Sequence, residues 1–155
     1  MGKKAFVTGS SGFIGFFTSK KLLSEGWDVV GIDNLNSYYD QNLKKSRQEI
    51  LLQHDNFTII NSSIEEPYIL KNIIEDHQPE LIIHLAAQAG VRYSIENPRA
   101  YLSSNVIGTF ELLEAAKLYP PKHLPESLPH EEEFQTIPMV YYLLQNQKLE
   151  RHRFF

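Results

Sequence analysis

The sequence contains no cysteine, which excludes disulfide bonds, thiolate nucleophiles and thiolate metal sites. It also has no apolar run close to the roughly 20 residues that span a bilayer. The short apolar run after Lys4 stops at Thr8. We therefore expect no signal peptide, no membrane segment and a cytoplasmic location.

An excess of positive charge is missing as well. The formal net charge is −4, so nothing in the charge balance favours nucleic acid or an anionic membrane as a partner. The six histidines include no pair spaced four residues apart on an expected helix, and we expect no metal site. The 155 residues, 42% hydrophobic and 22% charged, suit one globular domain.

The first 118 residues alternate strand and helix patterns. Short apolar runs that end at turn residues predict buried parallel strands, and longer segments with one apolar face predict helices. The expected strands are 4–8, 28–32, 57–60 and 81–86, and the expected helices are 13–24, 41–53, 67–77 and 98–118. Helix 41–53 is polar and expected to face solvent, and Gly26 is expected to cap helix 13–24. The order βαβαβαβα predicts a Rossmann-type α/β fold, a doubly wound parallel sheet with strand order 3-2-1-4.

The composition changes after Tyr119. Five prolines and three consecutive glutamates precede residue 139, and a basic aromatic segment ends the chain. We therefore divide the chain into a partial domain, 1–118, and an atypical tail, 119–155. Within the tail, residues 140–144 have two interpretations, a substitute sheet strand or part of a disordered tail.

Gly9, Gly12 and Gly15 form a G-x-x-G-x-x-G pattern between the first expected strand and helix. A tight turn and a close approach of backbone to a pyrophosphate both need residues without a Cβ. The N-terminus of the following helix offers unpaired N–H groups and a favourable dipole to negative charge. The pattern predicts a dinucleotide site, with a purely structural glycine-rich turn as the alternative.

Asp33 follows the second expected strand, eighteen positions after Gly15. This spacing is close to the roughly 20 residues typical of the acid that binds the adenosine ribose. A carboxylate there accepts hydrogen bonds from the ribose hydroxyls and repels a 2′-phosphate, which favours NAD over NADP. The alternative is an exposed loop acid.

Several segments together resemble one known family. Residues 8–15 (TGSSGFIG) resemble the glycine signature of extended short-chain dehydrogenases/reductases. Residues 33–40 (DNLNSYYD) and 84–94 (HLAAQAGVRYS) are similar to segments of UDP-glucuronate 4-epimerases, and 105–109 (NVIGT) and 112–116 (LLEAA) match the family's fourth helix. The resemblance covers residues 3 to about 118. It implies the NAD-binding part of a nucleotide-sugar epimerase, with a dehydratase or decarboxylase of the same family as alternatives.

The resemblance also implies which residues bind NAD and the substrate. Residues expected at the cofactor are Gly9, Gly12, Phe13, Ile14 and Gly15 at the pyrophosphate; Asp33, Asn34, Asn36, Ser63 and Ile64 at the adenosine; and Leu85, Ala86, Ala87 and Gln88 at the nicotinamide ribose. Asn105 is expected to steady the fourth strand by side-chain hydrogen bonds, with an ordinary polar helix position as the alternative. Residues expected to face a UDP-glucuronate-like nucleotide sugar are Gly90, Val91, Arg92 and Ser94. For Arg92, an ordinary surface charge is the alternative.

The sequence departs from the family at two places. Ser62 and Ser63 stand where the family usually has Gly-Asp, whose carboxylate meets the adenine amino group, so we expect weaker NAD binding. The family's catalytic Tyr-x-x-x-Lys pair is absent, because none of the eight tyrosines is followed four residues later by lysine. The sequence therefore offers no catalytic residue and predicts an inactive form.

Residues 122–124 resemble the start of the family's fifth strand, but Pro125 interrupts them. We therefore expect the sheet to be truncated before that strand. Strand 81–86 would then be an exposed sheet edge, which favours a homo-oligomer or pairing with another chain. A non-catalytic NAD-binding or interaction module is accordingly a second interpretation of function.

Overall fold

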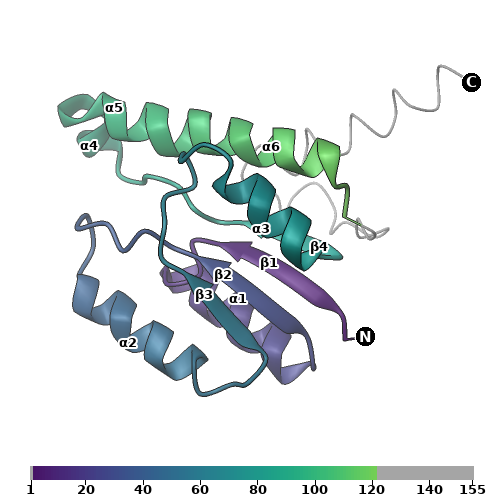
Figure 1. Cartoon of the computed structure of the whole chain (residues 1–155). Helices are drawn as coiled ribbons and strands as arrows, with labels where there is room; N and C mark the ends of the chain where they lie inside the picture. Colours follow the sequence, from purple (N-terminus) through teal and green to yellow (C-terminus); the bar gives the residue numbers. More distant parts are fainter. Residues whose placement is uncertain (1, 122–155) are drawn as a thin grey trace, which may run out of the picture. The chain divides into compact units, whose positions relative to one another are not determined.

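The computed structural model of the chain describes residues 2–121 (Figure 1). Its strands are β1 (Lys4–Thr8), β2 (Asp28–Ile32), β3 (Phe57–Ile60) and β4 (Leu81–His84). Its helices are α1 (Phe13–Ser24), α2 (Gln41–Leu51), α3 (Ile69–His77), α4 (Val91–Glu96), α5 (Pro98–Tyr101), the π-helix η1 (Leu102–Ile107) and α6 (Gly108–Leu118).

The four strands form one parallel sheet in the order β3-β2-β1-β4, which confirms the predicted fold class and strand order. Figure 1 shows α1 and α2 on one face of this sheet and α3 and α6 on the other. Parallel strands all end at the same edge of a sheet. The loops that follow β1, β2, β3 and β4 therefore meet along one edge, and this edge carries the candidate site.

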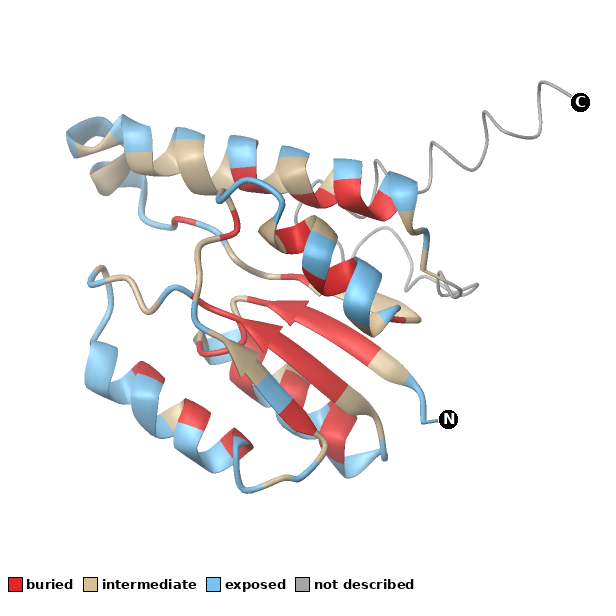
Figure 2. Cartoon of the chain, in the orientation of Figure 1, coloured by how far each residue is buried: buried red, intermediate tan, exposed pale blue. Residues whose placement is uncertain are grey.

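Alternating side chains of the sheet supply two apolar surfaces. Ala5 and Val7 of β1 belong to a buried cluster with Phe16 and Leu23 of α1. Phe6 alternates with them and points to the opposite face, where α3 packs against α6. Figure 2 shows β1 and β2 buried over most of their length, as expected for the middle of a sheet covered on both faces.

Helix α1 ends where the sequence predicts. Gly26 has φ +79°, its N–H donates to the carbonyl of Leu23, and the N–H of Trp27 donates to the carbonyl of Leu22. These two bonds are the Schellman motif, which satisfies the last carbonyls of a helix. Gly26 caps the helix because an L side chain is strained at that φ.

Strand β4 is two residues shorter than predicted. The prediction extended to Ala86, but the strand ends at His84 because its neighbour β1 stops at Thr8. Gly9 has φ +69° and turns the chain away, so β1 offers no further ladder positions. The Leu85 N–H is shared between the Thr8 carbonyl and the Thr8 hydroxyl, and the Ala86 N–H donates to the hydroxyl.

The helix predicted over 98–118 is interrupted. The chain is helical throughout this range, but η1 widens it to π geometry between α5 and α6. The short helix α4 was not predicted at all. The predicted helices 41–53 and 67–77 end at Leu51 and begin at Ile69, respectively.

The predictions for residues 122–124 and 140–144 lie outside the described residues, as does most of the 119–155 tail. Pairing through the β4 edge therefore stays a prediction, and so does the boundary at residue 118. Among residues 2–121, β4 pairs with β1 alone, and no helix is long and apolar enough to cross a membrane.

Candidate dinucleotide site

The turn between β1 and α1 requires glycine at two of its three glycine positions. A Cβ on Gly9 would lie 2.8 Å from the backbone nitrogen of Ala86, and the residue also has positive φ. A Cβ on Gly15 would lie 2.1 Å from the carbonyl oxygen of Gly9. Gly9 therefore lets β1 approach the loop after β4, and Gly15 lets α1 start directly against the turn.

Gly12 is different, because the protein itself scarcely crowds it. A Cβ there would meet only the Gly9 carbonyl oxygen, at 3.1 Å, and its φ of −67° suits any residue. No side chain caps the N-terminus of α1, and its first turn contains no acidic residue. The N–H groups of Phe13 and Ile14 belong to this first turn, whose donors have no partner within a helix. These donors, beside an open glycine, are suited to a phosphate group.

Side chains of helix α2 hydrogen-bond to the glycine-rich turn at Ser11. The side-chain amide of Gln48 donates to the Ser11 hydroxyl at 2.8 Å, and the Arg47 guanidinium donates to the Ser11 carbonyl at 3.2 Å. Lys44, Gln48 and Leu51 are buried. The prediction that this polar helix faces solvent is therefore wrong for one of its faces, which packs under the turn.

Asp33 lies directly after β2 and is only 7% exposed, so it is not an exposed loop acid. Its Oδ2 accepts from the Ser11 N–H at 3.1 Å, and its Oδ1 accepts from the Leu35 N–H at 2.9 Å. The carboxylate thus connects the glycine-rich turn to the loop after β2. A carboxylate oxygen can accept two hydrogen bonds, so Oδ2 keeps one acceptor site for a ligand.

Lys44 pairs with Asp33, a contact that was not predicted. Its Nζ lies 3.4 Å from Oδ1 of Asp33 and 3.2 Å from Oδ1 of Asn36, and the side chain is 9% exposed. The ammonium therefore offsets the charge of the Asp33 carboxylate.

A hydrogen-bonded chain of Thr8, His84 and Thr109 holds the carboxyl end of β4. The Thr8 hydroxyl accepts from the N–H groups of Leu85 and Ala86, which occupy both of its lone pairs. Its own proton must therefore go to Nδ1 of His84, 2.6 Å away. Nε2 then carries the ring proton and donates to the Thr109 hydroxyl at 3.2 Å. Burial lowers the pKa of His84 from 6.5 to about 4, so the ring is neutral at physiological pH.

Asn105 clamps the segment after β4 from the π-helix. Its Oδ1 accepts from the backbone N–H of Gln88 at 2.7 Å, and its Nδ2 donates to the carbonyl of the same residue at 3.0 Å. The alternative, an ordinary polar helix position, does not describe these contacts. The clamp holds Gln88 at the edge of the pocket described next.

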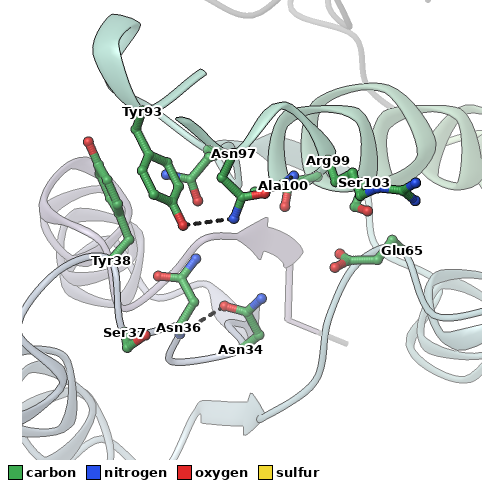
Figure 3. Close-up of a pocket in the computed structure, with 12 residues that line it drawn as sticks. Asn34, Asn36, Ser37, Tyr38, Glu65, Tyr93, Asn97, Arg99, Ala100 and Ser103 are labelled. Atoms are coloured by element: carbon green, nitrogen blue, oxygen red, sulfur yellow. Dashed lines mark hydrogen bonds between the residues drawn. The ribbon is translucent and has the colours of Figure 1, made fainter. Parts of the chain in front are cut away.

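A pocket of about 290 Å³ opens at this edge of the sheet (Figure 3). Its walls are the loop after β2, the loop after β3, the segment after β4 and the α4–η1 region. Its lining residues are Asn34, Asn36, Ser37, Tyr38, Glu65, Gln88, Tyr93, Asn97, Arg99, Ala100, Ser103 and Ser104. Of the residues predicted at the adenosine and nicotinamide ribose, Asn34, Asn36 and Gln88 are in the lining.

Ser63 and Ile64, which were also predicted at the adenosine, contact other side chains of the protein. The Ser63 hydroxyl accepts from Nδ2 of Asn34 at 3.1 Å. The Ile64 side chain is buried and lies where a Cβ on Gly108 would stand. Glu65 was not predicted, because an acidic residue in a polar loop carries no signal that separates a pocket wall from a solvated surface.

The four residues predicted at the substrate lie at the start of α4, outside the pocket lining. Gly90 has φ +100°, and a Cβ there would collide with the Tyr38 hydroxyl. The Ser94 hydroxyl donates to the Val91 carbonyl at 2.6 Å. Val91 and Arg92 are exposed. No described contact tests their role at a substrate.

The sequence profile of the GDP-mannose 4,6 dehydratase family matches residues 6–127. The chain belongs to this family. A probable UDP-glucuronate 4-epimerase of Rhizobium meliloti (strain 1021) is 48% identical over 118 residues, covering 76% of this chain and 35% of the relative. The UDP-glucuronate 4-epimerase of Thermodesulfobacterium geofontis is 46% identical over 118 residues, covering 76% of this chain and 36% of the relative.

A solved member of the epimerase group has a similar fold. The crystal structure of UDP-glucuronic acid 4-epimerase from Bacillus cereus, in complex with UDP-glucuronic acid and NAD, has a TM-score of 0.71. It is 28% identical, and the match covers 95% of this chain and 50% of that one. The chain spans 35% and 36% of the two curated relatives, about a third of their length.

Proposed function

We propose that residues 2–121 bind NAD as the cofactor-binding part of a nucleotide-sugar epimerase of the UDP-glucuronate type. The observation that carries the proposal is the open N-terminus of α1 at Gly12, adjoining the buried carboxylate of Asp33. Uncapped N–H groups suit the diphosphate, and the acid on the neighbouring strand suits the ribose hydroxyls.

The relatives support NAD and UDP-glucuronic acid as the ligands of the family's longer members. Bound NAD would supply hydride transfer at C4 of the sugar. The 155 residues hold no Tyr-x-x-x-Lys pair to move the hydroxyl proton. We therefore assign them cofactor binding without turnover, which conversion of UDP-glucuronate by the purified chain would contradict. Dehydratase or decarboxylase chemistry would need the same missing proton-transfer residues.

The cofactor preference should depend on Asp33. Asp33→Asn keeps the shape of the side chain but removes the charge that pairs with Lys44, so the ammonium becomes available to a 2′-phosphate. We expect the wild-type chain to bind NAD in preference to NADP. In the variant we expect about a tenfold weaker affinity for NAD, a gain for NADP and loss of the preference. Calorimetric titration with each dinucleotide measures both affinities.

Asp40→Asn is the matched control. Asp40 lies on the same loop, is exposed, and its Oδ1 accepts from the Asn42 N–H. Its backbone carbonyl accepts from the Lys44 N–H, but in the described structure the Lys44 ammonium pairs with Asp33 and not with the Asp40 carboxylate. This variant makes the same change of charge and should keep the wild-type preference. An unaltered preference in Asp33→Asn would show that the carboxylate does not select the cofactor.

A further inference from the structure

Glu65 presents a carboxylate without a hydrogen-bond partner in the wall of the pocket. It lies in the loop between β3 and α3, and Figure 3 shows its carboxylate directed toward the space between Asn34 and Ser103. Its Oε2 is shielded from solvent and has no hydrogen-bond partner within residues 2–121. A buried acceptor that lacks a donor is unfavourable, so a ligand that brings a donor to this carboxylate would be stabilised there.

The sheet order places the base of a bound dinucleotide next to this residue. In the proposed complex the diphosphate would bind after β1 at the start of α1, and the adenosine ribose would bind after β2 at Asp33. Strand β3 is the next neighbour in the sheet, so the base attached to that ribose extends toward the loop after β3. Asn34, Asn36 and Glu65 line the same pocket at this point.

We propose that Glu65 accepts a hydrogen bond from the exocyclic amino group of adenine and so selects adenine among purine bases. The inference rests on the proposed binding of NAD. The amino group is a donor, and a carboxylate is the strongest side-chain acceptor for it. Rotation of the carboxylate about its last torsion, which is broad, brings either oxygen to the pocket.

Ser63 is the nearest competitor for this role, since it lies two residues away in the same loop. Its hydroxyl already accepts from Nδ2 of Asn34, and a neutral hydroxyl is a weaker acceptor than a carboxylate. Glu65 has no such partner. The position of the family's adenine-binding carboxylate is therefore serine in this chain, and the acceptor lies two residues later.

The test compares NAD with nicotinamide hypoxanthine dinucleotide, in which an oxo group replaces the adenine amino group. An oxo group is an acceptor, so it would face the Glu65 carboxylate without a proton between them. We expect the full wild-type chain to bind NAD at least about tenfold more tightly than the analogue. Glu65→Gln can donate to the oxo group, and we expect it to reduce the ratio to about threefold or less.

Glu66→Gln is the control, because Glu66 is the exposed neighbour and the substitution makes the same change of charge. It should keep the wild-type ratio, and thermal unfolding of each variant shows that the fold is intact. A Glu65→Gln ratio equal to that of the wild type, with NAD still bound, overturns this inference and leaves NAD binding standing. Loss of the ratio in Ser63→Ala alone also overturns it, and assigns the base to Ser63. A wild-type chain that binds neither dinucleotide overturns both proposals.

Discussion

Replacing Gly15 with alanine is expected to destabilise the fold by about 3 kcal/mol or more. The new Cβ would lie 2.1 Å from the carbonyl oxygen of Gly9 and 2.9 Å from Cα of Ser10. Both are backbone atoms of the turn, so no change of rotamer can relieve the overlap, and α1 must move away from β1. Urea unfolding followed by circular dichroism measures the loss of stability.

Gly26→Ala provides the comparison for that experiment. Unlike Gly15, Gly26 has a positive φ of +79°, and a Cβ there would have nothing within 4 Å among residues 2–121. Its substitution should therefore cost only the backbone strain, about 1 kcal/mol. If Gly15→Ala were no more destabilising than Gly26→Ala, the close packing of α1 against the glycine-rich turn would be refuted.

The second large effect concerns pH and His84. Burial holds the pKa of this ring at about 4 in the folded protein, against 6.5 in the unfolded chain. Between these values the unfolded state binds more protons, so the free energy of unfolding falls as the pH falls from 6.5 to 4. The loss attributable to His84 should be about 2 kcal/mol at pH 5 and about 3 kcal/mol below pH 4. Above pH 6.5 the ring is neutral in both states and stability is retained.

The hydrogen bonds that link Thr8, His84 and Thr109 explain why a charged His84 ring is unfavourable. Nδ1 must accept the Thr8 proton while Thr8 holds the N–H groups of Leu85 and Ala86. A proton on Nδ1 would put two donors face to face and release the end of β4. His84→Gln should remove this part of the pH dependence in urea titrations between pH 4 and pH 8. His77→Gln, which substitutes a half-buried histidine, should keep it; equal slopes in wild type and His84→Gln would contradict the account.

The sheet and its turns could be predicted because their signals are local. Apolar runs that stop at Gly9 and at Asp33 define β1 and β2, and the glycine spacing defines the turn between β1 and α1. The end of β4 was misplaced because it depends on where β1 stops, which is a property of the neighbouring strand. The π geometry of η1 was missed because a pattern with helical period does not distinguish it from an α-helix.

The sequence analysis singled out the glycine-rich turn and Asp33, but it missed the buried partner Lys44. Asp33 was identified from its spacing, but its partner Lys44 belongs to a helix whose polar composition indicates solvent exposure. The signal that would have found Lys44 is its spacing with Gln48 and Leu51, which lie four and seven residues on and share its face of α2. To recognise this face of α2 as buried, one must know that it packs against the turn between β1 and α1, and composition does not show this.

The central claim is that the start of α1 holds the diphosphate of NAD. Backbone amide spectra of the full ¹⁵N-labelled chain, recorded during titration with NAD, test it directly. The account predicts the largest shifts at the N–H groups of Gly12, Phe13 and Ile14, with the amide of Leu35 beside Asp33 shifting at the same midpoint. Saturating NAD that leaves these amides unmoved, or moves only amides elsewhere in residues 2–121, would contradict it.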